Sequence, residues 1–466
     1  MGISSLGVGS GILTQDLLDK LRKADESGQL TPVKLSIANE KDKQSALEVL
    51  DANMKNFMDS ITELKSGTLY DERLATVSGS KSVDVTASAN SDIQDFTMSV
   101  NTLATKQIEE SGAFASGGNS ISDSDGTFKL EVGSQSVNID YVAGTTLDQL
   151  KKLIQEQAGS LVDATVLQVS STESRLILSS KETGAAQDIK ISDVLGTLDT
   201  KLTSDSSFKA DGSGNAPIQT ALDSSFDFNG QTLTRSSNTI DDIITGYSIK
   251  LLKEDAVGEN SDVSVAQNRE NIISRVDSFV EKYNSAITEL GKLTKSSSGT
   301  DKGIFSNESI VKGLKSATEN IIGSVGGGVG TLYDYGFDVD KDGVMTIDKT
   351  IFNKKLDENP ANVEAFFSGG TFTKSDSTTV ELTGAFTDMA TEIESYTKYN
   401  AMLDQLNDSI TTQISSFEDR EKSVTERLDS KYAILKKKFA SYDVLINKFN
   451  SSSDIFTQLA NQANSN

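Results

Sequence analysis

The sequence contains no cysteine, no histidine and no tryptophan among its 466 residues, and only three prolines. Without cysteine and histidine the chain has no disulfide, no thiol nucleophile, no thiolate or imidazole ligand for zinc and no Ser-His-Asp triad. These absences remove most of the familiar classes of enzyme site. We therefore predict no catalytic residues, no cofactor and no metal, and expect a protein that is not an enzyme.

The sequence is also poor in positive charge and in long apolar runs. Its 44 lysines and arginines stand against 68 aspartates and glutamates, a net charge of −24. Such a charge opposes binding to nucleic acid and anionic membranes. No apolar run approaches the ~18 residues that span a bilayer, and the first eleven residues lack the basic start and hydrophobic core of a secretory signal. We expect no nucleic-acid or membrane partner, and a cytosolic protein unless another export route takes it.

Residues 387–449 carry a hydrophobic pattern with a period of seven. No glycine or proline interrupts this run, and ten of its fourteen core positions are apolar or tyrosine. Such a spacing keeps one narrow apolar seam on one side of a helix, as in a coiled coil. At about 1.5 Å per residue the helix would be about 90 Å long, and it would need a partner. The alternative is a long core helix of a large domain. The core positions are Leu403, Asn407, Ile410, Ile414, Phe417, Glu421, Val424, Leu428, Lys431, Leu435, Lys438, Tyr442, Leu445 and Phe449.

A candidate partner for this seam lies near the other end of the chain. Thr31 as N-cap and Pro32 after it predict the start of a helix, and Gly67 predicts its end. Its apolar positions are Val33, Leu47, Leu50, Met54, Phe57, Ile61 and Leu64. A shorter amphipathic helix, with Thr14 as a possible cap, is predicted from Ile12, Leu13, Leu17, Leu18 and Leu21. If the two ends pair, the first and last parts of the protein form one stalk, and everything between them is an insertion.

From about Val77 the hydrophobic period changes to two, which predicts half-buried strands. Asn229-Gly230 predicts a type I′ hairpin turn, and Thr146 with Gln149 predicts a capping box at the start of a short helix. Residues 195–217 are rich in Ser, Asp and Gly and predict a linker or mobile loop. Helical periodicity returns near Arg269. The β-rich parts are thus nested inside helical material.

Four segments invite a chemical interpretation that their context weakens. The glycine-rich stretch 323–330 lacks the Gly-Lys-Ser/Thr of a phosphate loop, so a loop is favoured. The stretch 338–343 (Asp-Val-Asp-Lys-Asp-Gly) resembles the start of a calcium loop, but its twelfth position is Lys349, which favours a tight turn. Asp241-Asp242 suits a glycosidase pair only by chance adjacency. The cluster 436–438 of three lysines is either a solvated helix face or a contact for an acidic helix.

Motifs along the chain resemble, in order, those of the flagellar filament cap family, also called flagellar hook-associated protein 2. The N-terminal motif is Ile3-Ser-Ser-Leu-Gly-Val-Gly-Ser-Gly11. A repeat shared by flagellins and hook-associated proteins is matched by Gly126-Thr-Phe-Lys-Leu-Glu-Val-Gly133, Thr146-Leu-Asp-Gln-Leu150 and Lys181-Glu-Thr-Gly-Ala-Ala186. The middle and C-terminal signatures are matched by the segments that start at Phe228, Phe279, Asn359 and Lys437.

The resemblance implies an α+β multidomain fold in which N- and C-terminal helices pair as a coiled-coil or helical-bundle leg, with nested β-rich head domains inserted between them. The expected domains are a terminal coiled-coil region (1–40 and 416–466), a helical leg (41–75 and 268–415), a β-rich head domain (76–102 and 223–267) and a second one (103–222). The polar seam positions Asn407, Glu421, Lys431 and Lys438 would set the register, or lie against a neighbouring subunit or flagellin; the alternative is an imperfect seam.

The function that the resemblance implies is a structural cap at the distal end of the bacterial flagellar filament. The expected partners are further copies of the chain in a ring, with five subunits expected, together with flagellin, the hook–filament junction proteins and an export chaperone. Export would use the flagellar type III channel without a cleaved signal. The alternatives are a glycan-binding adhesin, a glycosidase or lyase that uses acidic residues, and a hook–filament junction protein or flagellin.

Overall fold

The computed structural model describes residues 6–7, 11–12, 14–203, 217–297, 301–321 and 329–463. The chain forms two compact units. One combines both ends of the chain, Met1–Leu69 with Glu270–Asn466, and the other is the continuous stretch Tyr70–Arg269. The predicted fold class, with paired terminal helices and β-rich parts nested between them, is confirmed.

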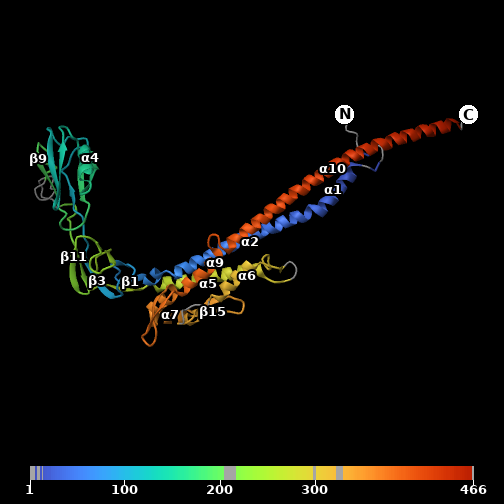
Figure 1. Ribbon diagram of the computed structural model, residues 1–466. Helices are drawn as coiled ribbons and strands as arrows, with labels where there is room; N and C mark the ends of the chain where they lie inside the picture. Colours follow the sequence, from blue (N-terminus) through green and yellow to red (C-terminus); the bar gives the residue numbers. More distant parts are fainter. Residues whose placement is uncertain are drawn as a thin grey trace. The chain divides into compact units, whose positions relative to one another are not determined.

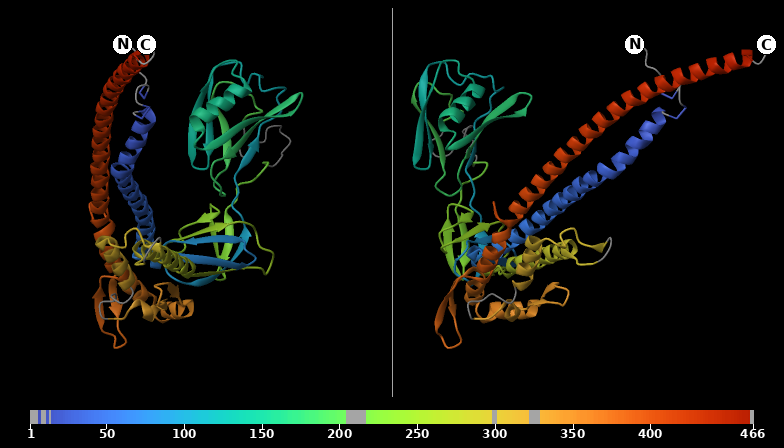
Figure 2. Two further views of the ribbon diagram at one scale, coloured as in Figure 1. Left: turned by 90° about the vertical axis from the view of Figure 1, so that its right-hand side faces the viewer. Right: turned by 45° about the vertical axis from the view of Figure 1, so that its right-hand side comes forward.

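Three helices dominate the first unit: α1 (Gln15–Gln29), α2 (Thr31–Leu64) and α10 (Met402–Ala463). Figure 1 shows α10 running beside α2 and α1, and both views of Figure 2 agree. The predicted cap of α1 is present, since the Thr14 hydroxyl accepts a hydrogen bond from the Leu17 N–H at 3.2 Å. The predicted cap of α2 is wrong. Leu30 is helical and its N–H donates to the Glu26 carbonyl at 2.8 Å, so α1 runs directly into α2 and Thr31 is already helical.

The helix predicted to run unbroken from residue 387 is two helices, α9 (Ala385–Thr397) and α10. Between them Asn400 has a φ of 61°, a left-handed conformation that asparagine tolerates better than most residues. The Asp404 carboxylate in the first turn of α10 accepts a hydrogen bond from the Asn400 N–H at 2.8 Å, which ties the turn before α10 to the helix. The predicted seam begins at Leu403 and therefore lies within α10.

Shorter elements complete the first unit, and several of them contribute rings to one aromatic core. They are α5 (Arg269–Thr294), α6 (Ser309–Asn320), α7 (Lys349–Glu358), α8 (Pro360–Ser368), a 3-10 turn (Leu332–Tyr335), and the hairpins β15–β16 (Phe337–Val339, Met345–Ile347) and β17–β18 (Gly370–Thr373, Thr379–Leu382). In the core, the Phe279 ring centroid lies 5.6 Å from that of Phe57 and 4.9 Å from that of Phe386. The predicted helix end at Gly67 is wrong, because α2 ends at Leu64 and Gly67 begins α3 (Gly67–Asp71).

The second unit contains two hydrophobic cores. The first lies between the sheets β1-β14-β3-β10-β11 and β12-β13-β2. These strands are β1 (Arg73–Gly79), β2 (Val83–Ala87), β3 (Asp95–Thr102), β10 (Ser224–Phe228), β11 (Gln231–Arg235), β12 (Thr239–Ile240), β13 (Tyr247–Leu251) and β14 (Ser261–Gln267). Asn229 and Gly230 have φ values of 48° and 82°, as the predicted type I′ turn requires.

The second core lies between the sheets β4-β8-β7 and β6-β5-β9 and the helix α4. The elements are β4 (Ile108–Glu110), β5 (Gly126–Val132), β6 (Gln135–Tyr141), α4 (Leu147–Ala158), β7 (Val162–Ser170), β8 (Glu173–Ser180) and β9 (Ile189–Leu195). The capping box of Thr146 and Gln149 is present. Leu198 and Leu202 are buried in this core, so the start of the predicted linker is part of the fold. The division of the chain into four domains stays a prediction.

Candidate assembly surface

The helices α1 and α2 near the start of the chain pair with α10 near its end, and they run in the opposite direction to it. Lys41 donates to Glu418 at 2.9 Å, whereas Arg22, nearer the start of the chain, donates to Asp429 at 2.6 Å, nearer its end. Between these two contacts Arg427 donates to Gln29 at 2.8 Å. The partner on α10 therefore moves toward the C-terminus as the position on α1 and α2 moves toward the N-terminus. Both ends of the chain thus build one stalk.

The predicted seam residues fall into three groups. All seven from α2 are buried, and so are Leu403, Ile410, Ile414, Val424 and Leu428 from α10. Phe417 and Leu435 are half-buried. Tyr442, Leu445 and Phe449 are 54%, 61% and 78% exposed. The third group is not covered within one chain, and its role as an assembly seam stays a prediction.

The predicted α2 seam does not face one partner along its whole length. Phe57 packs against Phe279 and Tyr283 of α5, with ring centroids 5.6 Å and 5.9 Å apart. Because α10 begins only at Met402, it covers the N-terminal part of α2 but does not reach the C-terminal part that contains Phe57. The C-terminal part of α2 therefore belongs to the aromatic core of the unit, while its N-terminal part belongs to the stalk.

Two of the four polar seam positions have partners across the stalk. Lys431 donates to Asp25 at 2.6 Å, and the Glu421 carboxylate lies 3.6 Å from the Lys34 ammonium. Tyr432 donates to the same Asp25 carboxylate at 2.7 Å. The hydrogen bonds from Lys431 and Tyr432 lower the pKa of Asp25, and burial together with the Asp25 carboxylate raises the pKa of Tyr432 to about 12.

The other two polar positions differ. Asn407 lines a small cavity of about 150 Å³ between α2 and α10, beside Asp51 and Asp404. Burial and the nearby Asp404 carboxylate raise the pKa of Asp51. Lys438 is exposed and makes no hydrogen bond or ion pair in the part of the chain that the structure describes. The three lysines at 436–438 are all exposed on α10, so the choice between a solvated face and a contact for an acidic helix stays open.

The apolar stripe of α10 continues past the end of the stalk pairing. Two further positions in the same seven-residue repeat, Phe456 and Leu459, are 72% and 54% exposed. Figure 1 shows α10 extending beyond the start of α1. The repeat predicted from the sequence ended at Phe449, although the same period continues to Phe456 and, after the polar Ser452, to Leu459. The end of α10 thus presents an exposed apolar stripe, which a soluble monomer rarely keeps uncovered.

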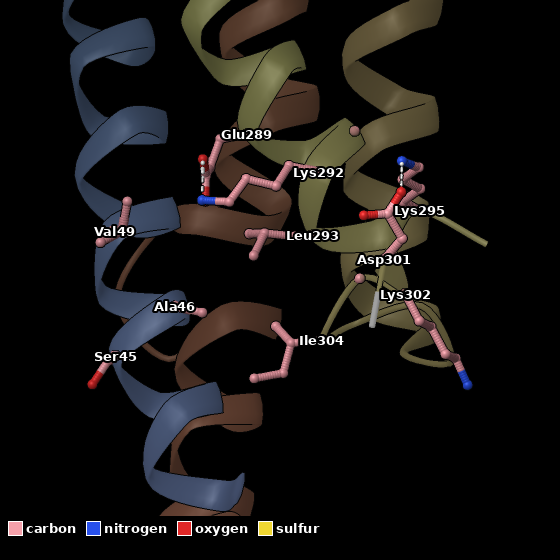
Figure 3. A pocket seen from close by; sticks show the side chains of 12 residues that line it. Ser45, Ala46, Val49, Glu289, Lys292, Leu293, Lys295, Asp301, Lys302 and Ile304 are labelled. Atoms are coloured by element: carbon pink, nitrogen blue, oxygen red, sulfur yellow. Dashed lines mark hydrogen bonds and ion pairs between the residues drawn. The ribbon is translucent and has the colours of Figure 1, made fainter. Parts of the chain in front are cut away.

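The largest surface pocket that we describe, about 720 Å³, lies between α2 and the end of α5 (Figure 3). Its charges are largely satisfied locally. Lys292 donates to Glu289 at 3.3 Å, and Lys295 donates to Asp301 at 2.9 Å. Val49, half exposed, adds an apolar wall. The two acidic residues that line the pocket, Glu289 and Asp301, are thus each paired with a lysine close by in the chain.

Segments with a possible chemical role behave as structural elements. No group of three or more acidic side chains suited to a metal ion occurs among the described residues, and no helix described here is long and apolar enough to cross a membrane. Residues 338–343 comprise the end of β15 and most of the turn to β16, where the Asp340 carboxylate accepts hydrogen bonds from the N–H groups of Asp342 and Val344. Asp242 is paired with Arg235 at 2.9 Å. Most of the glycine-rich stretch 323–330 lies outside the described residues.

Comparisons with known proteins match most of the chain. The family model for the flagellar hook-associated protein 2 N-terminus matches residues 10–107, and the model for the C-terminus of the same family matches residues 221–451. Flagellar hook-associated protein 2 of Aeromonas caviae is 23% identical over 477 residues, covering 98% of each chain. Its counterpart in Campylobacter jejuni is 28% identical over 417 residues, which cover 78% of this chain but only 64% of that relative.

A solved structure supports the fold independently. The crystal structure of the D1-D2-D3 domains of the flagellar cap protein FliD from Escherichia coli matches with a TM-score of 0.62 and 22% identity. The match covers 78% of this chain and 99% of that one. The two chains therefore share their fold over most of this chain.

Proposed function

The chain belongs to the flagellar hook-associated protein 2 family, and we propose that it caps the distal end of the bacterial flagellar filament. In this role it promotes the folding and insertion of flagellin and prevents the loss of flagellin from the tip. The role is structural rather than enzymatic. The comparisons do not support the alternative of a glycan-binding adhesin, and we do not propose it.

One observation carries the proposal: both ends of the chain pair as a stalk, and the end of α10 leaves an apolar stripe exposed. Tyr442, Phe449 and Phe456 are more than half exposed along this stripe. A row of exposed apolar residues at coiled-coil positions is typical of a surface that another helix covers. A stalk that anchors in a helical polymer supplies such a cover, since the polymer offers helices at its growing end.

The proposed partners follow from this role. The chain assembles with further copies of itself into a ring, with five subunits expected, and it contacts flagellin and the hook–filament junction proteins. An export chaperone covers the exposed end of α10 before assembly. The protein leaves the cell through the flagellar type III channel without a cleaved signal peptide and acts at the tip of the flagellum.

Sedimentation velocity and negative-stain imaging of the purified protein test the proposal. We expect a closed ring at micromolar concentration and ring-shaped particles at the tips of isolated filaments. Cells that lack the gene should secrete unpolymerised flagellin while their hooks remain complete. A chain that stays monomeric at high concentration and binds no filament would contradict the proposal.

A further inference from the structure

A groove of about 470 Å³ lies where α1 meets α2, against the middle of α10. Pro32 has no N–H to donate to the carbonyl of Gly28 one turn earlier, and its ring crowds that turn. The chain changes direction between α1 and α2 (Figure 1), as such a proline produces. The floor of the groove is apolar, made by Val33 and Val424, which are buried, and Phe417, which is half-buried.

Two arginine side chains of α10 lie beside this apolar floor. Arg420 and Arg427 both line the groove. They are seven residues apart, so they lie on one side of α10, about 10 Å from one another along the helix. Arg427 donates one hydrogen bond to Gln29 at 2.8 Å. Arg420 is exposed and has no hydrogen bond or ion pair with any described residue. The groove therefore offers two guanidinium groups, each suited to a carboxylate.

Two acidic residues repeat at the same spacing directly beside the arginines. Asp419 precedes Arg420 and Glu426 precedes Arg427, and both acids are exposed. Neither acid makes an ion pair or hydrogen bond with a described residue. The neighbouring acids differ, because Glu418, Glu421 and Asp429 are paired with Lys41, Lys34 and Arg22 across the stalk. Asp419 and Glu426 thus lie on one face of α10 without a partner among the described residues. Each is next in sequence to an arginine of the adjacent face, so the acids and the arginines lie at nearly the same positions along the helix axis.

We infer that this groove is a contact between two copies of the chain, in which Arg420 and Arg427 of one copy pair with Asp419 and Glu426 of the next. The inference rests on the proposed assembly into a ring. Rotation about an axis along the stalks places equal residues of neighbouring copies at equal heights. The acids of one α10 then stand level with the arginines of its neighbour. The two faces differ, so the contact is head-to-tail and can close into a ring.

Charge reversal tests the inference. In R420E/R427E the two like-charged rows face one another, so we expect the ring to be lost at a concentration where the unmodified chain is fully assembled. The fourfold variant D419R/E426R/R420E/R427E exchanges the two rows and should restore the ring. K422E/K436E changes the net charge by the same amount at exposed α10 positions outside the groove, and it should assemble normally. Circular dichroism and thermal unfolding check that each variant is folded.

Each outcome of these measurements decides the matter. If R420E/R427E sediments as a ring like the unmodified chain, the groove is not the contact, while the proposed ring stands. If the unmodified chain forms no ring at any concentration, both the inference and the proposed function fail. If R420E/R427E keeps the ring but no longer binds filament tips, the groove receives flagellin rather than a second copy. If the fourfold variant fails to restore the ring, the pairing of these two rows is wrong.

Discussion

The Lys431 ammonium donates to the Asp25 carboxylate at 2.6 Å, and this contact joins two residues that are 406 positions apart in the chain. Tyr432 donates to the same carboxylate at 2.7 Å. One aspartate near the start of the chain thus holds two consecutive residues near its end. The contact can form in only one antiparallel register, so it selects that register against the others that a heptad seam would allow.

Removal of this contact should loosen α1. In Asp25→Ala both Lys431 and Tyr432 lose their partner, and amide hydrogen exchange in α1 should accelerate several-fold while the aromatic core around Phe279 keeps its protection. Lys20→Ala is the matched control, because among the described residues Lys20 pairs only with Asp16, one turn away in the same helix. Hydrogen exchange measured by mass spectrometry checks both variants. Unchanged exchange in Asp25→Ala would show that the apolar seam alone fixes the stalk.

Two apolar residues of α10 should respond differently to truncation. Leu428 is 2% exposed in the stalk, so Leu428→Ala should lower the free energy of unfolding by about 3 kcal/mol, the usual cost of a buried leucine. Phe449 is 78% exposed, so Phe449→Ala should leave the unfolding of the monomer unchanged but weaken assembly. Denaturant unfolding and sedimentation velocity separate the two effects. A destabilised monomer in Phe449→Ala would mean that this residue packs within its own chain.

Asp51 should destabilise the stalk at neutral pH. Burial and the nearby Asp404 carboxylate raise its pKa, so the folded state holds the proton more tightly than the unfolded state does. Stability contributed by the protonated form is therefore lost as the pH rises through the unfolded and then the folded pKa. Asp51→Asn should raise the thermal unfolding temperature at pH 7 and leave it unchanged at low pH. Asp59→Asn is the control: it removes the exposed partner of Lys55 and should not raise the unfolding temperature at pH 7.

Asp255 should make the first β-rich core sensitive to acid. Burial opposes ionisation, but hydrogen bonds from Ser80, the Val100 N–H and Ser82 outweigh it and hold the pKa of Asp255 below its ordinary value of 3.8. A carboxyl group of this kind stabilises the folded state above its unfolded pKa, and the stabilisation is lost as the pH falls through the folded pKa. Asp255→Asn should therefore speed amide exchange of β3 at pH 7, with the difference from the unmodified chain disappearing at low pH. Asp241→Asn serves as an exposed control.

Periodic and turn signals in the sequence predicted much of this fold. The alternation of Phe96, Met98 and Val100, the Asn229-Gly230 turn and the Thr146 capping box each act within a few residues, so local chemistry decides them. The break at Asn400 was not predicted because asparagine occurs in helices as well as in left-handed turns. The Asp404 carboxylate that accepts the hydrogen bond of its N–H lies four residues further on. Local propensity did not reveal that break.

The candidate assembly surface was predictable only in part. The heptad repeat located the seam, but a single sequence cannot say where α1 begins opposite α10, and so which seam residues stay exposed. The partners of Lys431 and Glu421 lie about 400 residues away and follow from the register alone. The groove beneath Arg420 and Arg427 needs the bend at Pro32, which sequence reasoning took only as a helix start.

The central claim is the antiparallel pairing of the two chain ends, and a cysteine pair tests it most directly. The chain has no cysteine of its own, so Gln44→Cys with Thr411→Cys introduces the only two thiols. The Nε2 atom at the end of the Gln44 side chain lies 3.5 Å from the Thr411 Oγ1 atom, so the two positions face one another across the stalk. Cysteine is shorter than glutamine, so a short bismaleimide is used to join the two thiols. We predict efficient cross-linking within one chain by the bismaleimide, and none in the control pair Gln44→Cys with Ser452→Cys. Equal cross-linking of both pairs, or of neither, would contradict the account.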